Sequence, residues 1–82
     1  MHIFKTINQS ATFPFSPETP TDAICIVNQG SNDNVELIVD DGKEIHSILC
    51  TPAGRAYYGE YKQILSVAFV SGTAFQVQFL RK

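Results

Sequence analysis

The sequence predicts a small all-β domain, an antiparallel β-sandwich of jelly-roll type that follows an extended N-terminal arm. Two observations support this fold class. Short runs of β-branched and aromatic residues alternate with clusters of Gly, Pro, Asn and Asp, a spacing typical of the many short strands in a sandwich or small barrel. Between these clusters, no segment has the apolar period of an amphipathic helix.

Length and composition point to self-association. A chain of 82 residues holds one domain, near the lower size at which a hydrophobic core is stable without a supplement such as oligomerisation. Apolar residues make up 44% of the chain and charged residues 17%, which excludes a disordered composition. So low a charge suits a protein that hides surface against copies of itself. We therefore expect a homo-oligomer or filament.

The charge and the N-terminus exclude several other partners. With a net charge of −2 and no cluster of Lys and Arg, the chain lacks the basic footprint that nucleic-acid binding requires. No apolar run approaches the roughly 20 residues of a membrane span, so we expect no membrane insertion. The start Met1-His2-Ile3-Phe4-Lys5 lacks the basic and long apolar regions of a signal peptide. We therefore expect synthesis in the cytoplasm without a signal peptide.

Three segments follow one another along the chain. Residues 1–13 are predicted as an N-terminal arm or connector, and residues 21–82 as the β-sandwich domain. Between them, residues 14–20 contain three prolines at every third position, which favours an extended linker of polyproline type. The arm carries the large apolar side chains Ile3, Phe4, Ile7 and Phe13. The strands expected within the domain are 23–27, 35–39, 44–50, 56–61, 64–70 and 74–80.

Side-chain parity predicts the register of two hairpins. A three-residue loop, Asp40-Asp41-Gly42, would place Leu37 opposite Ile45 on one face, with Gly42 in the left-handed position of a type I turn plus bulge. The loop Val70-Ser71-Gly72 would align the last two strands in the same way, again with a glycine third.

These registers define a core and an outer surface. The predicted core is Ile24, Ile26, Val35, Leu37, Val39, Ile45, Leu49, Leu65, Val67, Phe69, Phe75, Val77 and Phe79. The aliphatic residues assigned to the opposite faces are Ile38, Ile48, Ile64, Val70 and Leu80. Because so many aliphatics rarely face water, we expect the outer surfaces to be covered.

No residue set predicts an enzyme or a cofactor. In the register above, His46 faces Glu36 across the strand pair, which forms an ordinary cross-strand ion pair, and no nucleophile–base motif accompanies it. The acidic loops 31–34 and 40–42 have the residues of turns, and neither contains a full set of calcium ligands. We therefore predict no catalytic, cofactor-binding or metal site.

Two features leave alternatives open. Cys25 and Cys50 lie in apolar strands at a spacing that fits no metal motif, so they are either buried free thiols or a disulfide within or between chains. A tyrosine-rich stretch is either a subunit interface or ligand-binding patch, or an edge strand whose rings fold over the core. Its residues are Arg55, Tyr57, Tyr58 and Tyr61.

The N-terminal arm also has two interpretations. It pairs either with its own sheet or with the sheet of a neighbour, where main-chain hydrogen bonds would supply affinity and alternate side chains would fill pockets. A head-to-tail contact of the second kind does not close on itself and produces filaments.

Several residues resemble a known group of proteins. The arm Met1–Phe13, the linker Pro14–Pro20, the Pro52-Ala53-Gly54 turn and the closing Ser66–Val77 segment are similar to the fibre subunits of bacterial endospore appendages of the Ena type. In that group a short N-terminal connector precedes a small jelly roll. The arm here contains no cysteine, whereas those connectors carry cysteines that cross-link neighbours. The resemblance therefore implies docking by pairing and burial.

The sequence thus predicts a non-enzymatic structural subunit that self-assembles into a pilus-like fibre by docking its N-terminal strand on a neighbour. The resemblance implies a final location on a spore surface appendage, with an anchoring partner that the sequence does not identify. A phage virion protein of the tail, neck or capsid surface is the nearest alternative. A small ligand- or glycan-binding β-module is the alternative from another class.

Overall fold

Seven strands in two antiparallel sheets make up the part of the chain that the computed structural model describes, residues 2–18 and 21–81. They are β1 (His2–Asn8), β2 (Ala23–Asn28), β3 (Val35–Asp40), β4 (Ile45–Cys50), β5 (Ala56–Glu60), β6 (Ser66–Ser71) and β7 (Phe75–Arg81). The described residues contain no helix, so the predicted all-β class is confirmed. Met1, residues 19–20 of the predicted linker and Lys82 lie outside the described residues.

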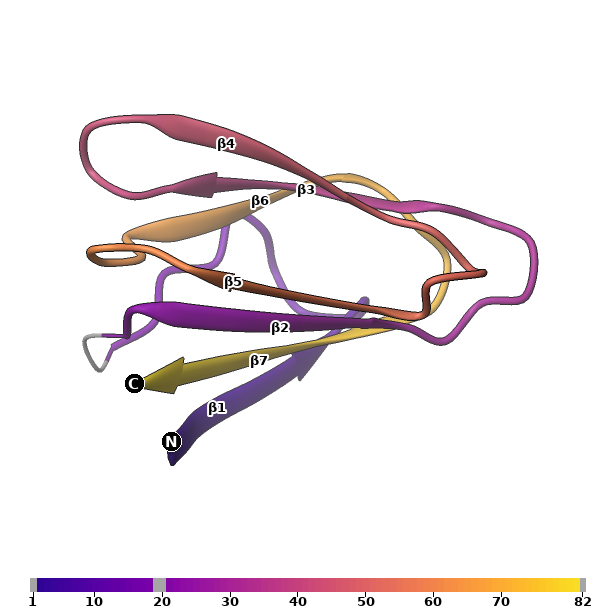
Figure 1. Ribbon diagram of the computed structural model, residues 1–82, viewed down its shortest axis with the longest axis horizontal. Helices are drawn as coiled ribbons and strands as arrows, with labels where there is room; N and C mark the ends of the chain where they lie inside the picture. The colour runs from indigo at the N-terminus through magenta and orange to yellow at the C-terminus, as the bar shows by residue number, and fades with distance from the viewer. Residues whose placement is uncertain (1, 19–20, 82) are drawn as a thin grey trace.

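The two sheets lie one above the other (Figure 1). The four-stranded sheet has the order β1-β7-β2-β5, and the three-stranded sheet has the order β4-β3-β6. Alternate residues of facing strands turn inward, and Leu37 of β3 and Val77 of β7 are fully buried. The alternating apolar pattern of the sequence therefore produces a β-sandwich, because each sheet can bury one face against the other.

The strand pairs are nested about one turn. β1 pairs with β7, β2 with β5 and β3 with β4, and Phe15 makes an isolated antiparallel bridge to Val67 of β6. In these four pairings the numbers of the two partners add to between 82 and 85. The chain is therefore one long antiparallel ribbon that reverses near residues 41–44. The ribbon is folded over, so that β2 also joins β7 and β3 also joins β6.

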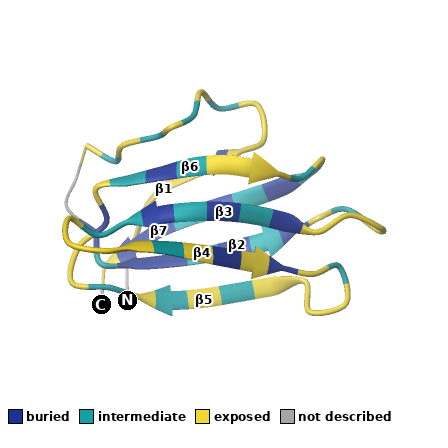
Figure 2. Cartoon of the chain, turned by 90° about the horizontal axis from the view of Figure 1, so that it is seen from above, coloured by how far each residue is buried: buried dark blue, intermediate teal, exposed yellow. Residues whose placement is uncertain are grey.

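Most of the predicted core is confirmed. Its buried members are Ile24, Ile26, Val35, Leu37, Val39, Val67, Phe75, Val77 and Phe79. The prediction is wrong for Ile45, Leu49, Leu65 and Phe69, which are between 44% and 71% exposed. It missed Ile7, Ile48, Cys50 and Ile64, which are buried in the core. Figure 2 shows the alternation of buried and exposed residues along β4 and the exposed end of β6.

The predicted register of the first hairpin is wrong. Leu37 lies opposite Ile48 and not Ile45, because the loop has four residues, 41–44. Asp41 closes this loop: its N–H donates to the Glu44 carbonyl at 3.1 Å, and its Oδ1 accepts from the N–H groups of Lys43 and Glu44 at 2.8 and 2.7 Å. The pairing is thus displaced by three residues along β4. An odd displacement exchanges the two faces of the strand, so Ile48 turns inward and Ile45 outward.

The second predicted hairpin does not form. β6 pairs with β3, while β7 pairs with β1 and β2 in the other sheet. The parity argument failed here because two strands that face the same core from opposite sheets have the same alternation as a hairpin. The predicted positive φ of both turn glycines is confirmed, at 95° for Gly42 and 142° for Gly72.

Candidate functional site

The predicted N-terminal arm forms β1, the edge strand of the four-stranded sheet, and pairs with β7 of the same chain. Ile7 turns inward opposite Val77 and is buried. Ile3 and Phe4 are 51% and 39% exposed, and the register shifts at Phe4, as in a β-bulge. Among the side chains described in this strand, Ile7 is therefore the one that anchors β1 in the core.

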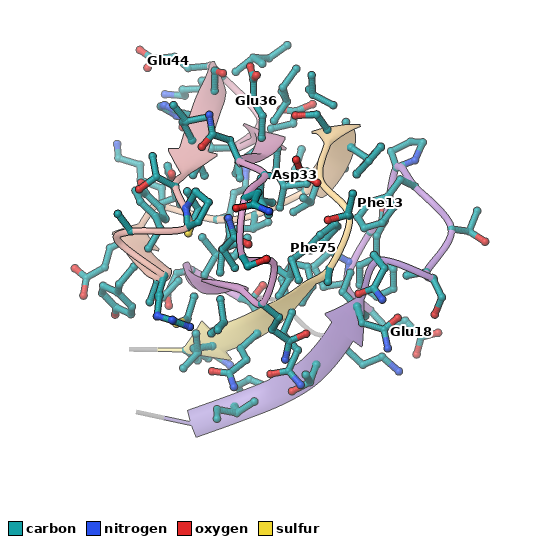
Figure 3. The ribbon with its side chains drawn as sticks, turned by 90° about the vertical axis from the view of Figure 1, so that its right-hand side faces the viewer. Phe13, Glu18, Asp33, Glu36, Glu44 and Phe75 are labelled. Carbon is teal, nitrogen blue, oxygen red and sulfur yellow. The ribbon has the colours of Figure 1, made fainter. Side chains whose placement is uncertain are left out.

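A connector of residues 9–18 leads from β1 back to the domain. Its Phe13 ring is partly buried, with its centroid 5.8 Å from that of Phe69 and 6.1 Å from that of Phe75. Figure 3 shows Phe13 close to Phe75 on the side where the connector crosses between the sheets. Two residues later, Phe15 bridges to Val67. The predicted linker is thus attached to β6 at Phe15.

A cavity of about 240 Å³ lies beside β1 and the connector. Phe4 and Lys5 line it from β1, and Phe15, Glu18 and Thr21 line it from the segment that follows. The Thr21 hydroxyl oxygen is buried and has no hydrogen-bond partner among the described residues. The first half of β1 therefore packs less tightly on the domain than the core strands do.

The tyrosine-rich stretch does not form one surface. Tyr57 and Tyr61 pack against the core, and their hydroxyl oxygens lie 3.1 Å apart. Tyr58 is exposed and donates a hydrogen bond of 2.9 Å to Glu60. Arg55 is exposed in the loop before β5, with a positive φ of 63°. Of the predicted interface residues in this stretch, Tyr58 and Arg55 therefore remain accessible.

A polar cluster occupies the turn between β3 and β4. Nε2 of His46 lies 2.8 Å from Oδ2 of Asp41 and 4.0 Å from Oε2 of Glu44, and its ring centroid lies 4.9 Å from that of Tyr61. The hydrogen bond to His46 lowers the pKa of Asp41 most, and the hydrogen bonds that Asp41 accepts from the N–H groups of Glu44 and Lys43 lower it further, to about 2. Burial raises the pKa of Tyr61 above its usual value. Two carboxylates and an imidazole thus meet at one end of the sandwich.

The predicted ion pair between His46 and Glu36 is wrong. With β4 displaced in register, His46 lies opposite Val39, and Glu36 instead accepts a hydrogen bond of 3.2 Å from Ser47. Parity reasoning missed the cluster for this reason. The spacing Asp-x-x-Glu-x-His across a turn is the signal that could have found it.

Aliphatic side chains project from the outer face of the three-stranded sheet. Ile45, Leu49 and Val70 are exposed, and the half-buried Ile38 lies between them on the central strand. The prediction of outward aliphatics is confirmed for Val70, but it is wrong for Ile48, Ile64 and Leu80, which are buried. The same change of register that buried Ile48 exposed Ile45 and Leu49.

Both thiols are free. Cys50 is buried and its Sγ lies 3.9 Å from the carbonyl oxygen of Ile26, and burial raises its pKa. Cys25 is half-buried on β2.

In the ranges that the structure describes, no helix is long and apolar enough to cross a membrane.

The chain was also compared with known protein families, curated proteins and solved structures. No protein-family model matches the chain, and no curated protein or solved structure is detectably similar to it.

Proposed function

We propose that this protein is a non-enzymatic structural subunit, a small jelly roll that self-assembles by docking its N-terminal strand on a neighbouring copy. The observation that carries the proposal is the attachment of β1. This strand is held by one ladder of hydrogen bonds to β7 and by the buried Ile7, and it stands at the end of a proline-containing connector.

The nested strand pairs support the jelly-roll assignment. In a jelly roll, an antiparallel ribbon is folded over into two sheets, and here the β1–β7, β2–β5 and β3–β4 pairs are successive rungs of such a ribbon. The Phe15–Val67 bridge fits between the first two rungs. In this assignment the bridge occupies the position of an eighth strand, paired with β6.

Strand exchange conserves the contacts of β1 itself, and its cost lies in the connector. Extending residues 9–14 gives up the packing of Phe13 on Phe69 and Phe75 and the hydrogen bond of 3.1 Å from the Phe75 N–H to the Gln9 side chain. A β1 strand from a neighbour would make the ladder that β1 makes in its own chain. Residues 9–14 precede the Phe15 bridge, and when extended they span about 20 Å. If the bridge opens, the chain before Thr21, whose carbonyl accepts from the Ile64 N–H, gives residues 9–20 a span of about 40 Å when extended, more than the 32 Å longest dimension of the domain. The connector can therefore reach an adjacent copy.

The geometry of exchange decides the form of the assembly. Reciprocal exchange between two copies closes a dimer, whereas donation from each copy to the next leaves a free end and builds a fibre. The outer aliphatic face of the three-stranded sheet supplies further apolar surface that an assembly would cover. A fibre of a spore appendage or a component of a virion would both use this architecture.

Cysteine cross-linking tests the proposal directly. Thr6 of β1 lies opposite Gln78 of β7, and opposed residues of antiparallel strands lie within disulfide range. In a Cys25→Ser background, Thr6→Cys and Gln78→Cys proteins are mixed, unfolded, refolded and oxidised. We expect an interchain disulfide between the two variants, seen as a dimer on non-reducing gels. The control replaces Gln78→Cys by Ser47→Cys, an exposed position on β4 of the other sheet, which should give no dimer with Thr6→Cys.

A second measurement shows whether docking drives assembly. Ile7→Asp places a charge on the buried side of β1, whereas Thr6→Asp places it on the exposed side. Light scattering and negative-stain microscopy should show that Ile7→Asp abolishes large species and that Thr6→Asp retains them. Full assembly of a folded Ile7→Asp protein, or an absence of interchain disulfide in the mixture, would overturn strand docking.

A further inference from the structure

The polar cluster at the β3–β4 turn has a geometry close to that of a metal site. One ligand atom from each of Asp41, Glu44 and His46 lies within 4.8 Å of the other two. Tetrahedral Zn²⁺ with bonds of about 2.0–2.2 Å to N and O holds adjacent ligand atoms roughly 3.4 Å apart. The His46–Asp41 and His46–Glu44 separations of 2.8 and 4.0 Å bracket that value. Small side-chain movements would therefore bring all three atoms into coordination.

Two of the three ligands are already held in place. Oδ1 of Asp41 is occupied by the N–H groups of Lys43 and Glu44, which leaves Oδ2 directed at His46. The His46 ring is supported by Tyr61. Glu44 is the mobile member, because its side chain is largely exposed. Orienting contacts of this kind lower the entropy that a ligand set loses on binding an ion.

A hollow adjoins the two carboxylates of the cluster. It has a volume of about 290 Å³ and is lined by Asp41, Lys43, Glu44, Lys62 and Gln63, but not by His46. It therefore provides room for water bound to an ion that the three side chains hold between them. The two carboxylates carry the charge that attracts a cation, while Lys43 and Lys62 in the lining oppose it. Attraction and repulsion both grow with the charge of the ion, so the choice of ion depends on the donor atoms.

The donor set indicates which ions fit. An imidazole nitrogen with two carboxylate oxygens suits Zn²⁺, Co²⁺ or Ni²⁺, whereas Ca²⁺ and Mg²⁺ prefer shells of oxygen alone. Three protein ligands leave at least one position for water. We propose that Asp41, Glu44 and His46 form an exchangeable binding site for a divalent transition-metal ion of the Zn²⁺ class.

Titration of the 82-residue chain with ZnCl₂, followed by calorimetry, tests the site. We expect saturable binding of one ion per chain that falls on the order of tenfold or more in His46→Gln, which removes the nitrogen ligand. Glu44→Gln should weaken binding by a smaller factor, and Lys62→Gln should strengthen it. Circular dichroism establishes that each variant is folded.

Matched controls locate the ion. His2→Gln and Cys25→Ser remove competing ligands elsewhere in the chain, and Glu36→Gln removes a nearby carboxylate outside the cluster. All three should bind Zn²⁺ as the parent protein does, and a hundredfold excess of Ca²⁺ should not displace it. Binding that survives His46→Gln, that is lost in His2→Gln or Cys25→Ser, or that never saturates would overturn the site, as would displacement by Ca²⁺.

Discussion

Phe15 and Val67 exchange both of their backbone hydrogen bonds, each with an N···O distance of 2.8 Å. This pair attaches the N-terminal connector to β6 at a point between β1 and β2 in the chain. The Phe15 ring also lies with its centroid 5.3 Å from that of the buried Phe79. The bridge therefore sets how much of the connector is free to move, and with it how far β1 can reach.

Loss of the Phe15 ring should weaken this attachment. Because the ring is half-buried, we expect Phe15→Ala to lower the free energy of unfolding by about 1–3 kcal/mol, less than for a fully buried phenylalanine. Urea denaturation measures the change, and Ser16→Ala, at the exposed next position, should differ from the parent by less than about 0.5 kcal/mol. If β1 exchanges between copies, Phe15→Ala should also raise the oligomer fraction in light scattering. Equal stability of the two variants would contradict the bridge.

Truncations on β4 distinguish the observed register from the predicted one. Ile48 is buried and its neighbour Leu49 is exposed, so Ile48→Ala should cost about 2–4 kcal/mol of unfolding free energy because it leaves a cavity. Leu49→Ala should cost less than about 1 kcal/mol. Both variants are compared by urea denaturation at the same pH. If Leu49→Ala were the more destabilising of the two, the predicted register with a three-residue loop would be correct and the observed register wrong.

Alanine at the turn glycines tests the two changes of chain direction. Gly42 and Gly72 have φ values that disfavour a Cβ atom. A Cβ on Gly72 would also lie 3.2 Å from side-chain atoms of both Phe75 and Val35, whereas on Gly42 it would chiefly displace the flexible end of Gln63. We expect a cost of about 1–2 kcal/mol for Gly42→Ala and about 2–4 kcal/mol for Gly72→Ala.

The control for these glycines is Gly54→Ala, whose neighbours are atoms of Thr51 at 3.3 Å and beyond. Its φ lies outside the positive range, so thermal denaturation should show a change smaller than for either turn glycine. A Gly72→Ala protein as stable as the Gly54→Ala protein would mean that the chain passes between the sheets by another route.

Thiol chemistry should separate the two cysteines. With a thiol reagent, we expect Cys25 to react first and Cys50 to react only when the protein unfolds locally or globally. The single variants Cys25→Ser and Cys50→Ala show which thiol gives each phase of the reaction. Burial raises the pKa of Cys50 in the folded protein above the ordinary value of 9.0. The neutral thiol therefore contributes stability that is present below this value and is lost as the pH rises through the folded pKa. Rapid reaction of Cys50 in folded protein would contradict its burial.

Much of the fold could be read from local pattern. The strand positions follow from alternating apolar residues and from the turn residues between them, which act within a few residues of each other. The same holds for the buried Val35, Leu37 and Val39 and for the positive φ of Gly42 and Gly72. For the candidate docking strand, the sequence also predicts that the N-terminal arm is extended and carries the apolar side chains Ile3, Phe4 and Ile7.

The tertiary structure alone decided which strands pair and in what register. Parity cannot tell a hairpin partner from a strand that faces it across the core, so β6 and β7 were joined when they belong to opposite sheets. The three-residue loop rested on the assumption that Ile45 faces the core, whereas Asp41 stabilises a four-residue loop through hydrogen bonds to the backbone. The resulting register turns Ile48 inward and places His46 beside Asp41, where the prediction had placed it beside Glu36. Short-range pattern determined the elements of this protein, whereas their pairing depended on burial and hydrogen bonds between residues far apart in the chain.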